Sequence, residues 1–375
     1  MFACATPEGT CRYVERLARG LAPACPPEHF REFPTAYGSL HLSSIGIGSY
    51  GGPVTDAADA EYADAVRSSM RQGMNIVDCS INYRHQRSER ALGTGLRRLF
   101  EAGEASRDEV FVMSKAGYLS FDGGMPAGPD EYIRKTYLET GLVPPAELVA
   151  RRHCIAPSFL EDQLSRSLAN FGLESLDCYY LHNLEEQLEE TTPEEFERRV
   201  TAAFTFLEAA VARGTIGRYG VATWNGFRVP QESPAHLSLE RLEALALAVG
   251  GKEHHFRVVQ LPYNLGMLEA LGTPSQGLQG GRVPLLEAAA HFGLMVVTSV
   301  PLLQTQVIAH VPAAFAPQMP GLTTQAQRAI QFVRSTPGVF APLVGMRRVV
   351  HVHENGALAH VPPLTPAEFY RMLGK

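Results

Sequence analysis

The sequence predicts an α/β fold, a (β/α)8 barrel of the TIM type, and two repeating patterns are the basis of this prediction. Eight short runs rich in Val and Ile recur along the 375 residues, and they are apolar throughout instead of alternating. Such runs are typical of parallel strands that are buried on both faces. Segments with apolar residues three and four positions apart lie between the runs, as expected for helices that cover a parallel sheet.

The expected strands share a short length and an apolar sequence. In chain order they are SSIGIGS (43–49), NIVDCS (75–80), EVFVMSK (109–115), LDCYYLH (176–182), IGRYGVAT (216–223), FRVVQLPYN (256–264), LMVVTSVPL (294–302) and VFAPLVGM (339–346). The expected helices open on capping residues, as where Pro193 follows Thr192, or close on glycine, as at Gly73, Gly172 and Gly214. Their ranges are 56–73, 156–172, 193–214, 239–250, 283–293, 323–335 and 347–358.

The chain reads as one barrel domain over 37–375, with an N-terminal extension over 1–36 and a short tail after about residue 360. In the lead-in, EFPTAYGSLHLSS (32–44) predicts a hairpin before the first barrel strand. No linker to a second domain is apparent, so we expect the polar residues at the strand ends to belong to one site.

One connection, 116–156, is far longer than the others. It places about forty residues between the third strand and its helix, where two to six are usual. Because the segment carries Tyr118, Phe121, Tyr132 and Tyr137, it has apolar surface to bury. We therefore expect an ordered lid over the rim of the barrel.

Composition argues against several classes of function. A net charge of −6 and a pI near 6.1 give no basic surface for nucleic acid. No apolar run approaches the roughly 18 residues of a membrane span, and the start of the chain lacks the order of a secretory signal. The six cysteines form no CxxC and are expected to be free thiols in a reducing compartment. These features predict a cytoplasmic protein without membrane or nucleic-acid partners.

A glycine motif near the start of the barrel, GIGSYG (46–51), fits the GxGxxG pattern of dinucleotide-binding folds. In those folds a helix begins directly after the motif, and an acidic residue follows about twenty positions on. Here Gly52-Pro53 interrupts the chain, and Asp78 is nearer thirty positions away. The better interpretation is a barrel strand whose glycines let a ligand approach closely, at Gly48 and Ser49.

Four polar residues follow the second, third and fourth strands. Asp78 ends the second strand and Tyr83 lies on its loop, Lys115 ends the third, and His182 ends the fourth. Because barrel enzymes carry their chemistry at the C-terminal ends of the strands, we expect the four side chains to meet there. A buried Lys115 needs a partner, which Asp78 provides.

The chemistry of this group suits protonation of an oxygen. A tyrosine is a poor acid at neutral pH, and a nearby ammonium makes the phenol a better proton donor. His182 is expected to donate a hydrogen bond to a substrate carbonyl oxygen and to orient it. Tyr83 would then be the general acid while another group attacks the carbon.

The same residues resemble the aldo-keto reductase family. DCSINY from Asp78, SKAG from Ser114 and LHN from Leu181 look like that family's Asp, Tyr, Lys and His tetrad, and SERALG around Glu89 looks like its SExxxG element. QLPYN from Gln260 and GMRRVVHVHEN from Gly345 resemble its cofactor-binding elements. The resemblance covers roughly 37–360 and implies an NAD(P)H-dependent oxidoreductase that reduces an aldehyde or ketone, or oxidises an alcohol.

The resemblance also implies where the cofactor lies. Thr223, Asn225 and Gln260 would hold the nicotinamide carboxamide, although Ala222-Thr223 replaces the family's usual Ser-Asn. The remaining implied contacts are Ser299 in place of a stacking aromatic, Leu302 and Gln304 along the diphosphate, Gly345 and Arg347 near a 2′-phosphate, His351 in place of an Arg or Gln, and Glu354 and Asn355 at the adenine. Arg347 favours NADP, with NAD also possible.

Two other functions are compatible with parts of the sequence. Some relatives of this family serve as redox-sensing or regulatory subunits, which would keep the fold and lose turnover. A metal-dependent barrel enzyme would need clustered ligands at the strand ends, and none is found; His254 and His255 are loop neighbours, while His351 and His353 point to different sides of a helix. No metal is therefore expected, and neither the substrate nor the oligomeric state is indicated.

Overall fold

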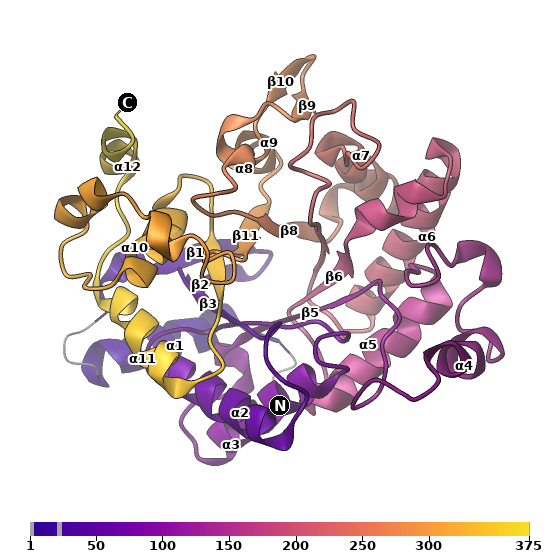
Figure 1. Ribbon diagram of the computed structural model, residues 1–375, viewed down its shortest axis with the longest axis horizontal. Helices are drawn as coiled ribbons and strands as arrows, with labels where there is room; N and C mark the ends of the chain where they lie inside the picture. Colours follow the sequence, from indigo (N-terminus) through magenta and orange to yellow (C-terminus); the bar gives the residue numbers. More distant parts are fainter. Residues whose placement is uncertain (1–3, 21–24, 375) are drawn as a thin grey trace.

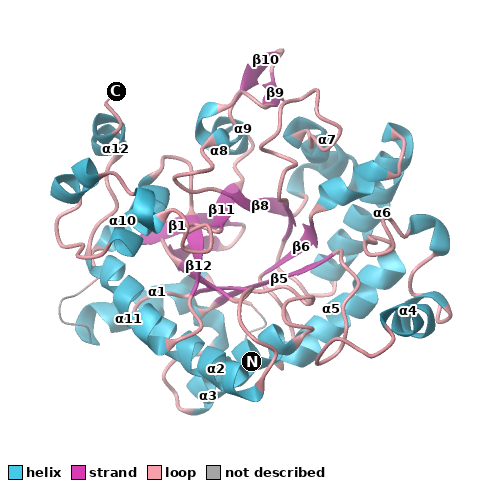
Figure 2. Ribbon diagram, in the orientation of Figure 1, coloured by secondary structure: helices cyan, strands magenta, loops and turns pink. Residues whose placement is uncertain are grey.

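The computed structural model describes residues 4–20 and 25–374, and in this part of the chain eight parallel strands close into a barrel surrounded by helices (Figure 1, Figure 2). Neighbouring strands pair in chain order, and β12 (Ala341–Gly345) pairs with β3 (Gly46–Gly48) to close the ring. The other barrel strands are β4 (Ile76–Asp78), β5 (Phe111–Ala116), β6 (Cys178–His182), β7 (Tyr219–Ala222), β8 (Phe256–Pro262) and β11 (Met295–Ser299). The predicted (β/α)8 barrel is confirmed.

The helices that follow the barrel strands form the outer layer. They are α2 (Asp56–Arg71), α3 (Arg87–Glu101), α5 (Pro157–Phe171), α6 (Pro193–Ala212), α7 (Leu239–Gly250), α9 (Leu285–His291), α10 (Gln325–Ser335) and α11 (Val349–Gly356). The sequence prediction omitted α3, whose sequence contains Gly93 and Gly95. A Cβ at Gly93 would lie 2.5 Å from the Phe171 carbonyl oxygen, and one at Gly95 2.3 Å from that of Ala63. These glycines allow α3 to pack closely between α2 and α5, at the cost of a weaker helical pattern.

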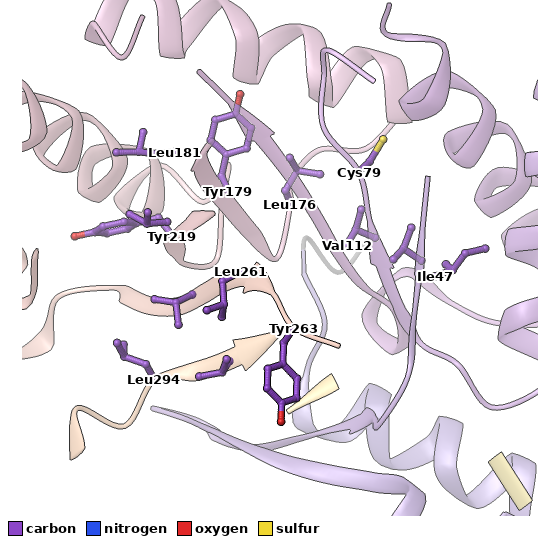
Figure 3. Packing of buried hydrophobic residues seen from close by; sticks show 14 of the residues in the cluster. Ile47, Cys79, Val112, Leu176, Tyr179, Leu181, Tyr219, Leu261, Tyr263 and Leu294 are labelled. Atoms are coloured by element: carbon purple, nitrogen blue, oxygen red, sulfur yellow. The ribbon is translucent and has the colours of Figure 1, made fainter. Parts of the chain in front are cut away.

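Alternate residues of each strand point into and out of the barrel, and this alternation aims the polar strand ends. On β5, Phe111 and Met113 pack inside the barrel, whereas Val112 packs outside against the helices, as does Ile47 of β3 (Figure 3). Continuing the alternation, Lys115 points inward. The same alternation of inward- and outward-facing residues directs Asp78 of β4, His182 of β6 and Gln260 of β8 toward the barrel axis.

The opposite end of the barrel is closed by a hairpin. Strands β1 (Phe30–Thr35) and β2 (Gly38–Ser43) pair in antiparallel fashion, as predicted, and the hairpin spans the expected boundary between 36 and 37. Phe33, Leu40 and Leu42 are buried in one cluster with the inward-facing side chains of the barrel strands. The hairpin therefore forms the floor of the barrel, and the rim at the strand C-termini is the accessible end.

Both ends of the chain carry helices that the sequence prediction did not foresee. Helix α1 (Pro7–Gly20) lies in the expected extension, of which residues 1–3 and 21–24 are outside the described residues. The Tyr13 hydroxyl donates to the Met70 carbonyl over 2.6 Å, and Arg12 pairs with Asp108 at 2.7 Å. In the expected tail, α12 (Pro366–Met372) buries Phe369. A second hairpin, β9 (Gln276–Leu278) with β10 (Gly281–Val283), follows the short helix α8 (Glu269–Gly272).

The long connection 116–156 is ordered, and much of it packs against the outer helices. Its helix α4 (Pro129–Ile133) lies at the outside of the ring (Figure 1). Tyr137 is fully buried against Phe159 of α5, and Arg199 of α6 donates to the Ala146 carbonyl over 2.7 Å. Tyr118 of the same segment lines the cavity, so the lid over the rim stays a prediction.

Candidate active site

A buried ion pair lies at the rim of the barrel. Lys115 Nζ donates to Asp78 Oδ1 and Oδ2 over 2.8 and 2.7 Å, and to the Cys79 carbonyl over 2.7 Å. Gln260 Nε2 donates to Asp78 Oδ1 over 3.0 Å. Burial raises the pKa of the Asp78 carboxyl, and the charge and hydrogen bonds of Lys115 oppose that rise. Each of the three protons of the ammonium therefore has an acceptor, and the ion pair is held in one orientation.

Tyr83 lies against this pair. The Lys115 ammonium is 5.2 Å from the centre of the Tyr83 ring, and the His182 ring centre is 5.9 Å away. Burial raises the pKa of Tyr83 well above its ordinary value, and the charge of Asp78 adds to this effect. The 5.2 Å separation brings the ammonium close to the phenol, as expected, while burial and the charge of Asp78 act against ionisation of the free phenol. The Tyr83 hydroxyl is therefore held in its protonated form.

The loop that presents Tyr83 has an unusual backbone. Arg84, His85 and Gln86 all have positive φ, at 49°, 57° and 72°, which is unfavourable for residues with a side chain. The Arg84 guanidinium fixes this turn by donating to the Pro53 carbonyl over 2.7 Å and to Asp59 over 2.6 Å. The turn places Tyr83 over the barrel opening before α3 begins.

His182 is supported from two sides. Its Nδ1 lies 3.1 Å from the Ser80 hydroxyl oxygen, and its carbonyl oxygen is 2.7 Å from His153 Nε2. The other ring nitrogen of His153 is 2.8 Å from Gln187 Nε2, so both nitrogens of this buried histidine are occupied. Burial lowers the pKa of His182 well below its ordinary value, and Lys115 and His153 add to this. His182 is therefore a neutral imidazole.

A cavity of about 690 Å³ opens above these groups. Asp78, Tyr83 and His182 line its base, and Lys115 lies behind them, fully buried. Several of the residues implied for cofactor binding line the wall: Gly48, Ser49, Thr223, Gln260, Ser299, Leu302, Gln304 and Gly345. The buried Thr223 Oγ1 has no hydrogen-bond partner among the described residues. A polar ligand in the cavity fits this arrangement, because it would satisfy that hydroxyl.

The remaining implied cofactor residues lie outside the cavity. Arg347 Nε is 2.8 Å from Glu61 of α2, and Arg348 Nη2 is 2.7 Å from His351 Nε2. Glu354 and Asn355 follow on α11, where Asn355 Oδ1 is buried without a partner in the described structure. The backbone N–H of Asn225 donates a hydrogen bond to Glu185 over 2.8 Å. The competing contact of Arg347 with a carboxylate was not foreseen from the sequence.

Sequence reasoning missed several residues of this site. Tyr50 and Trp224 form aromatic parts of the cavity wall, next to Tyr118, which the sequence had placed in the segment expected over the rim, 116–156. Glu185 Oε1 accepts hydrogen bonds from three successive backbone N–H groups, those of residues 224–226, over 2.6, 2.8 and 3.3 Å. This carboxylate fixes the loop after β7. Glu185 lies three residues after His182, and this position was the feature of the sequence that could have indicated its role.

Glu89 has structural surroundings. Glu89 is buried, accepts from Ser114 Oγ over 2.5 Å and Asn170 Nδ2 over 2.8 Å, and faces the helices instead of the cavity. In residues 4–20 and 25–374, no group of three or more His, Cys, Asp or Glu side chains is placed to hold a metal ion.

None of the helices described here is long and apolar enough to cross a membrane.

The barrel and this arrangement at its rim define the chain as a member of a reductase family. The family model described as "Aldo/keto reductase family" matches residues 44–247, which is more than half of the 375 residues. The chain therefore belongs to the aldo/keto reductase family. Strands β3 to β7, which carry most of the candidate site, lie within the matched range.

Individual relatives are distant. Aldose reductase B of Dictyostelium discoideum is 26% identical over 142 residues, covering 38% of this chain and 32% of that protein. A second relative, aldo-keto reductase family 4 member C11 of Arabidopsis thaliana, is 23% identical over 141 residues, 38% of this chain and 31% of that protein. The matched segment thus spans about a third of the length of these curated relatives.

Solved structures share the fold over nearly the whole chain. An aldo-keto reductase from Klebsiella pneumoniae in complex with NADPH superposes with a TM-score of 0.58 at 19% identity, covering 89% of this chain and 90% of that one. A holo-form aldo-keto reductase from Bacillus halodurans gives a TM-score of 0.59 at 16% identity, with coverages of 92% and 96%. At these identities the likeness concerns the fold.

Proposed function

We propose that this protein reduces the carbonyl group of an aldehyde or ketone to an alcohol, or catalyses the reverse reaction, with NADP as its cofactor. The observation that carries the proposal is the position of Tyr83 beside the Asp78–Lys115 pair, at the base of a large cavity. Family membership and the NADPH bound to the Klebsiella relative support the choice of cofactor. NAD stays possible, because Glu61 already occupies Arg347.

Each residue at the base of the cavity has a defined part in this proposal. Tyr83 donates its proton to the carbonyl oxygen of the substrate as that oxygen gains negative charge. The bound cofactor supplies the hydride that forms the new C–H bond. Lys115, 5.2 Å from the Tyr83 ring, stabilises the phenolate that is left, and Asp78 holds the ammonium in place. Burial of the pair keeps water away and strengthens these electrostatic effects.

The proposal is tested by a panel of aldehydes and ketones, with oxidation of NADPH and NADH followed by nicotinamide absorbance. We expect turnover with at least one carbonyl class, and loss of turnover without loss of cofactor binding in Tyr83→Phe. A wild-type protein that binds neither cofactor, or a Tyr83→Phe variant with wild-type turnover, would overturn the assignment. Cofactor binding without turnover in the wild type would favour a regulatory role on the same fold.

A further inference from the structure

The Lys115 ammonium lies between two tyrosine rings, and only one of these tyrosines lines the cavity. Its Nζ is 5.2 Å from the centre of the Tyr83 ring and 5.9 Å from the centre of the Tyr180 ring. Tyr83 lines the cavity, whereas Tyr180 of β6 is fully buried beneath it, among the inward-facing side chains of the barrel. The proposed reduction gives no part to Tyr180, although its ring is the second aromatic face against the ammonium.

The register of the strands places Tyr180 beside Lys115. The two residues are direct partners in the pairing of β5 with β6, so both side chains leave the sheet on the same face, toward the barrel axis. On its other side Tyr180 pairs with Gly220 of β7. A Cβ at Gly220 would lie 2.0 Å from the Val258 carbonyl oxygen and 3.0 Å from Tyr180 Cδ1. This glycine therefore leaves the space that the Tyr180 ring needs inside the barrel.

The hydroxyl of Tyr180 is occupied inside the barrel. It donates to Met113 Sδ over 3.0 Å. Burial raises the pKa of this phenol well above its ordinary value, and Cys178 and Asp78 add to this effect. Tyr180 is therefore a neutral tyrosine with an anchored hydroxyl, and it acts on Lys115 through the face of its ring.

The ring face complements the hydrogen bonds of the ammonium. Those bonds all go to residues 78 and 79, at the end of β4, whereas Tyr180 comes from β6 on the other side of β5. The negative face of an aromatic ring attracts a cation, and the attraction is strongest where water is excluded. Because Lys115 is fully buried, the contact with Tyr180 should be of the strong kind.

We propose that Tyr180 is a positioning residue whose ring face holds the Lys115 ammonium in place beside Tyr83. This inference rests on the proposed carbonyl reduction, in which the ammonium stabilises the phenolate that Tyr83 becomes when it gives its proton to the substrate. A displaced ammonium stabilises this phenolate less, and the transition state with it. Loss of the ring should therefore lower kcat and leave cofactor affinity unchanged.

The kinetic test compares three variants. Tyr180→Phe keeps the ring and removes the hydroxyl, whereas Tyr180→Leu removes the ring. Tyr179→Leu is the matched control, because Tyr179 is the preceding residue of β6, is equally buried and packs outside the barrel (Figure 3). In NADPH-dependent carbonyl reduction we expect kcat to fall about three- to thirtyfold in Tyr180→Leu, as for the loss of one buried cation–π contact. Tyr180→Phe and Tyr179→Leu should stay near the wild type, and KM for NADPH should be unchanged in all three.

A second measurement needs no activity. The chain has four lysines, at positions 115, 135, 252 and 375, so the ¹⁵N-lysine-labelled protein gives few ammonium signals by NMR, and Lys115→Met identifies that of Lys115. Burial and three hydrogen bonds should protect this ammonium from hydrogen exchange with water. We expect the exchange to be about three- to thirtyfold faster in Tyr180→Leu and unchanged in Tyr180→Phe and Tyr179→Leu.

If Tyr180→Leu does not fold, a fluorinated ring decides the question. Replacing Tyr180 with trifluorophenylalanine preserves the size of the ring and weakens its negative face. This variant should show a lower kcat and a faster exchange of the Lys115 ammonium than Tyr180→Phe. Values equal to those of Tyr180→Phe would overturn the part assigned to the ring.

The two arms separate this inference from the proposed function. A wild-type kcat or a wild-type exchange rate in Tyr180→Leu, or losses as large in Tyr180→Phe, would overturn the proposal. Equal losses in Tyr179→Leu would assign the effect to packing of the core and would overturn it as well. If no carbonyl is reduced while the exchange rates change as expected, the proposed function fails and the support of Lys115 by Tyr180 stands.

Discussion

Replacing Lys115 with methionine measures how strongly the barrel depends on the ion pair at its rim. The ammonium makes three hydrogen bonds, and methionine keeps the length of the side chain while removing all of them. Asp78 then keeps the Gln260 amide as its donor in the described structure. Removing one partner of a buried pair typically costs about 3–5 kcal/mol. That is a large share of the roughly 5–15 kcal/mol that stabilises a typical domain.

The loss in Lys115→Met should also depend on pH. Burial already raises the pKa of Asp78, and without Lys115 the pKa rises further. A carboxyl whose pKa is higher in the folded than in the unfolded protein stabilises the fold below its unfolded pKa, near 4, and this contribution is lost as pH rises through the folded value. The variant should therefore become less stable as the pH is raised above about 4.

Urea unfolding followed by circular dichroism at several pH values is the assay. The Asp78→Asn/Lys115→Met double variant has no carboxyl at this position and should lose the added pH dependence. Lys135→Met, which breaks a pair with Glu131 in which both side chains are 61% exposed, should cost less than about 1 kcal/mol. A loss below about 1 kcal/mol in Lys115→Met, or one independent of pH, would refute the view that this pair is buried and charged.

Three further predictions concern the site. Tyr83→Phe should lower the carbonyl reduction rate by about 10²–10⁴-fold with cofactor affinity retained, as measured by steady-state kinetics and fluorescence titration; equal loss of affinity would contradict it. Glu61→Gln should tighten NADPH binding by about two- to fivefold and leave NADH binding unchanged, because it releases Arg347; a parallel change for both cofactors argues against a phosphate contact. Glu185→Ala should reduce the free energy of unfolding by about 1–3 kcal/mol and raise KM, while Glu185→Gln, which keeps an acceptor oxygen, should restore much of both.

The sequence predicted the tetrad positions because one rule governs them. Asp78 and His182 end apolar strands and Lys115 is the last residue but one of β5, and parallel strands place their C-terminal ends at one rim. The proximity of these three side chains could therefore be predicted from the order of the strands along the chain. Ser80 and Glu185 escaped because their importance comes from contacts made across folded space, such as the 102 residues that separate Ser80 from His182.

The long connection 116–156 shows what composition can indicate and what it cannot. The aromatic residues of 116–156 correctly indicated that the segment buries apolar surface, but a pattern of burial does not say against which element. Tyr137 packs on α5, and Tyr118 lines the cavity. Helix α3 was overlooked for a related reason, because Gly93 and Gly95 weaken the local helical signal while serving the packing between helices.

The hairpin floor has a consequence for the order of events in turnover. Phe33, Leu40 and Leu42 fill the barrel from below, so the cavity has no exit through its floor in the described part of the chain. Two molecules that occupy the cavity together and both enter over the rim would share that path. The one seated deeper has to arrive first and leave last, and the exchange rate of the inner molecule is limited by departure of the outer one.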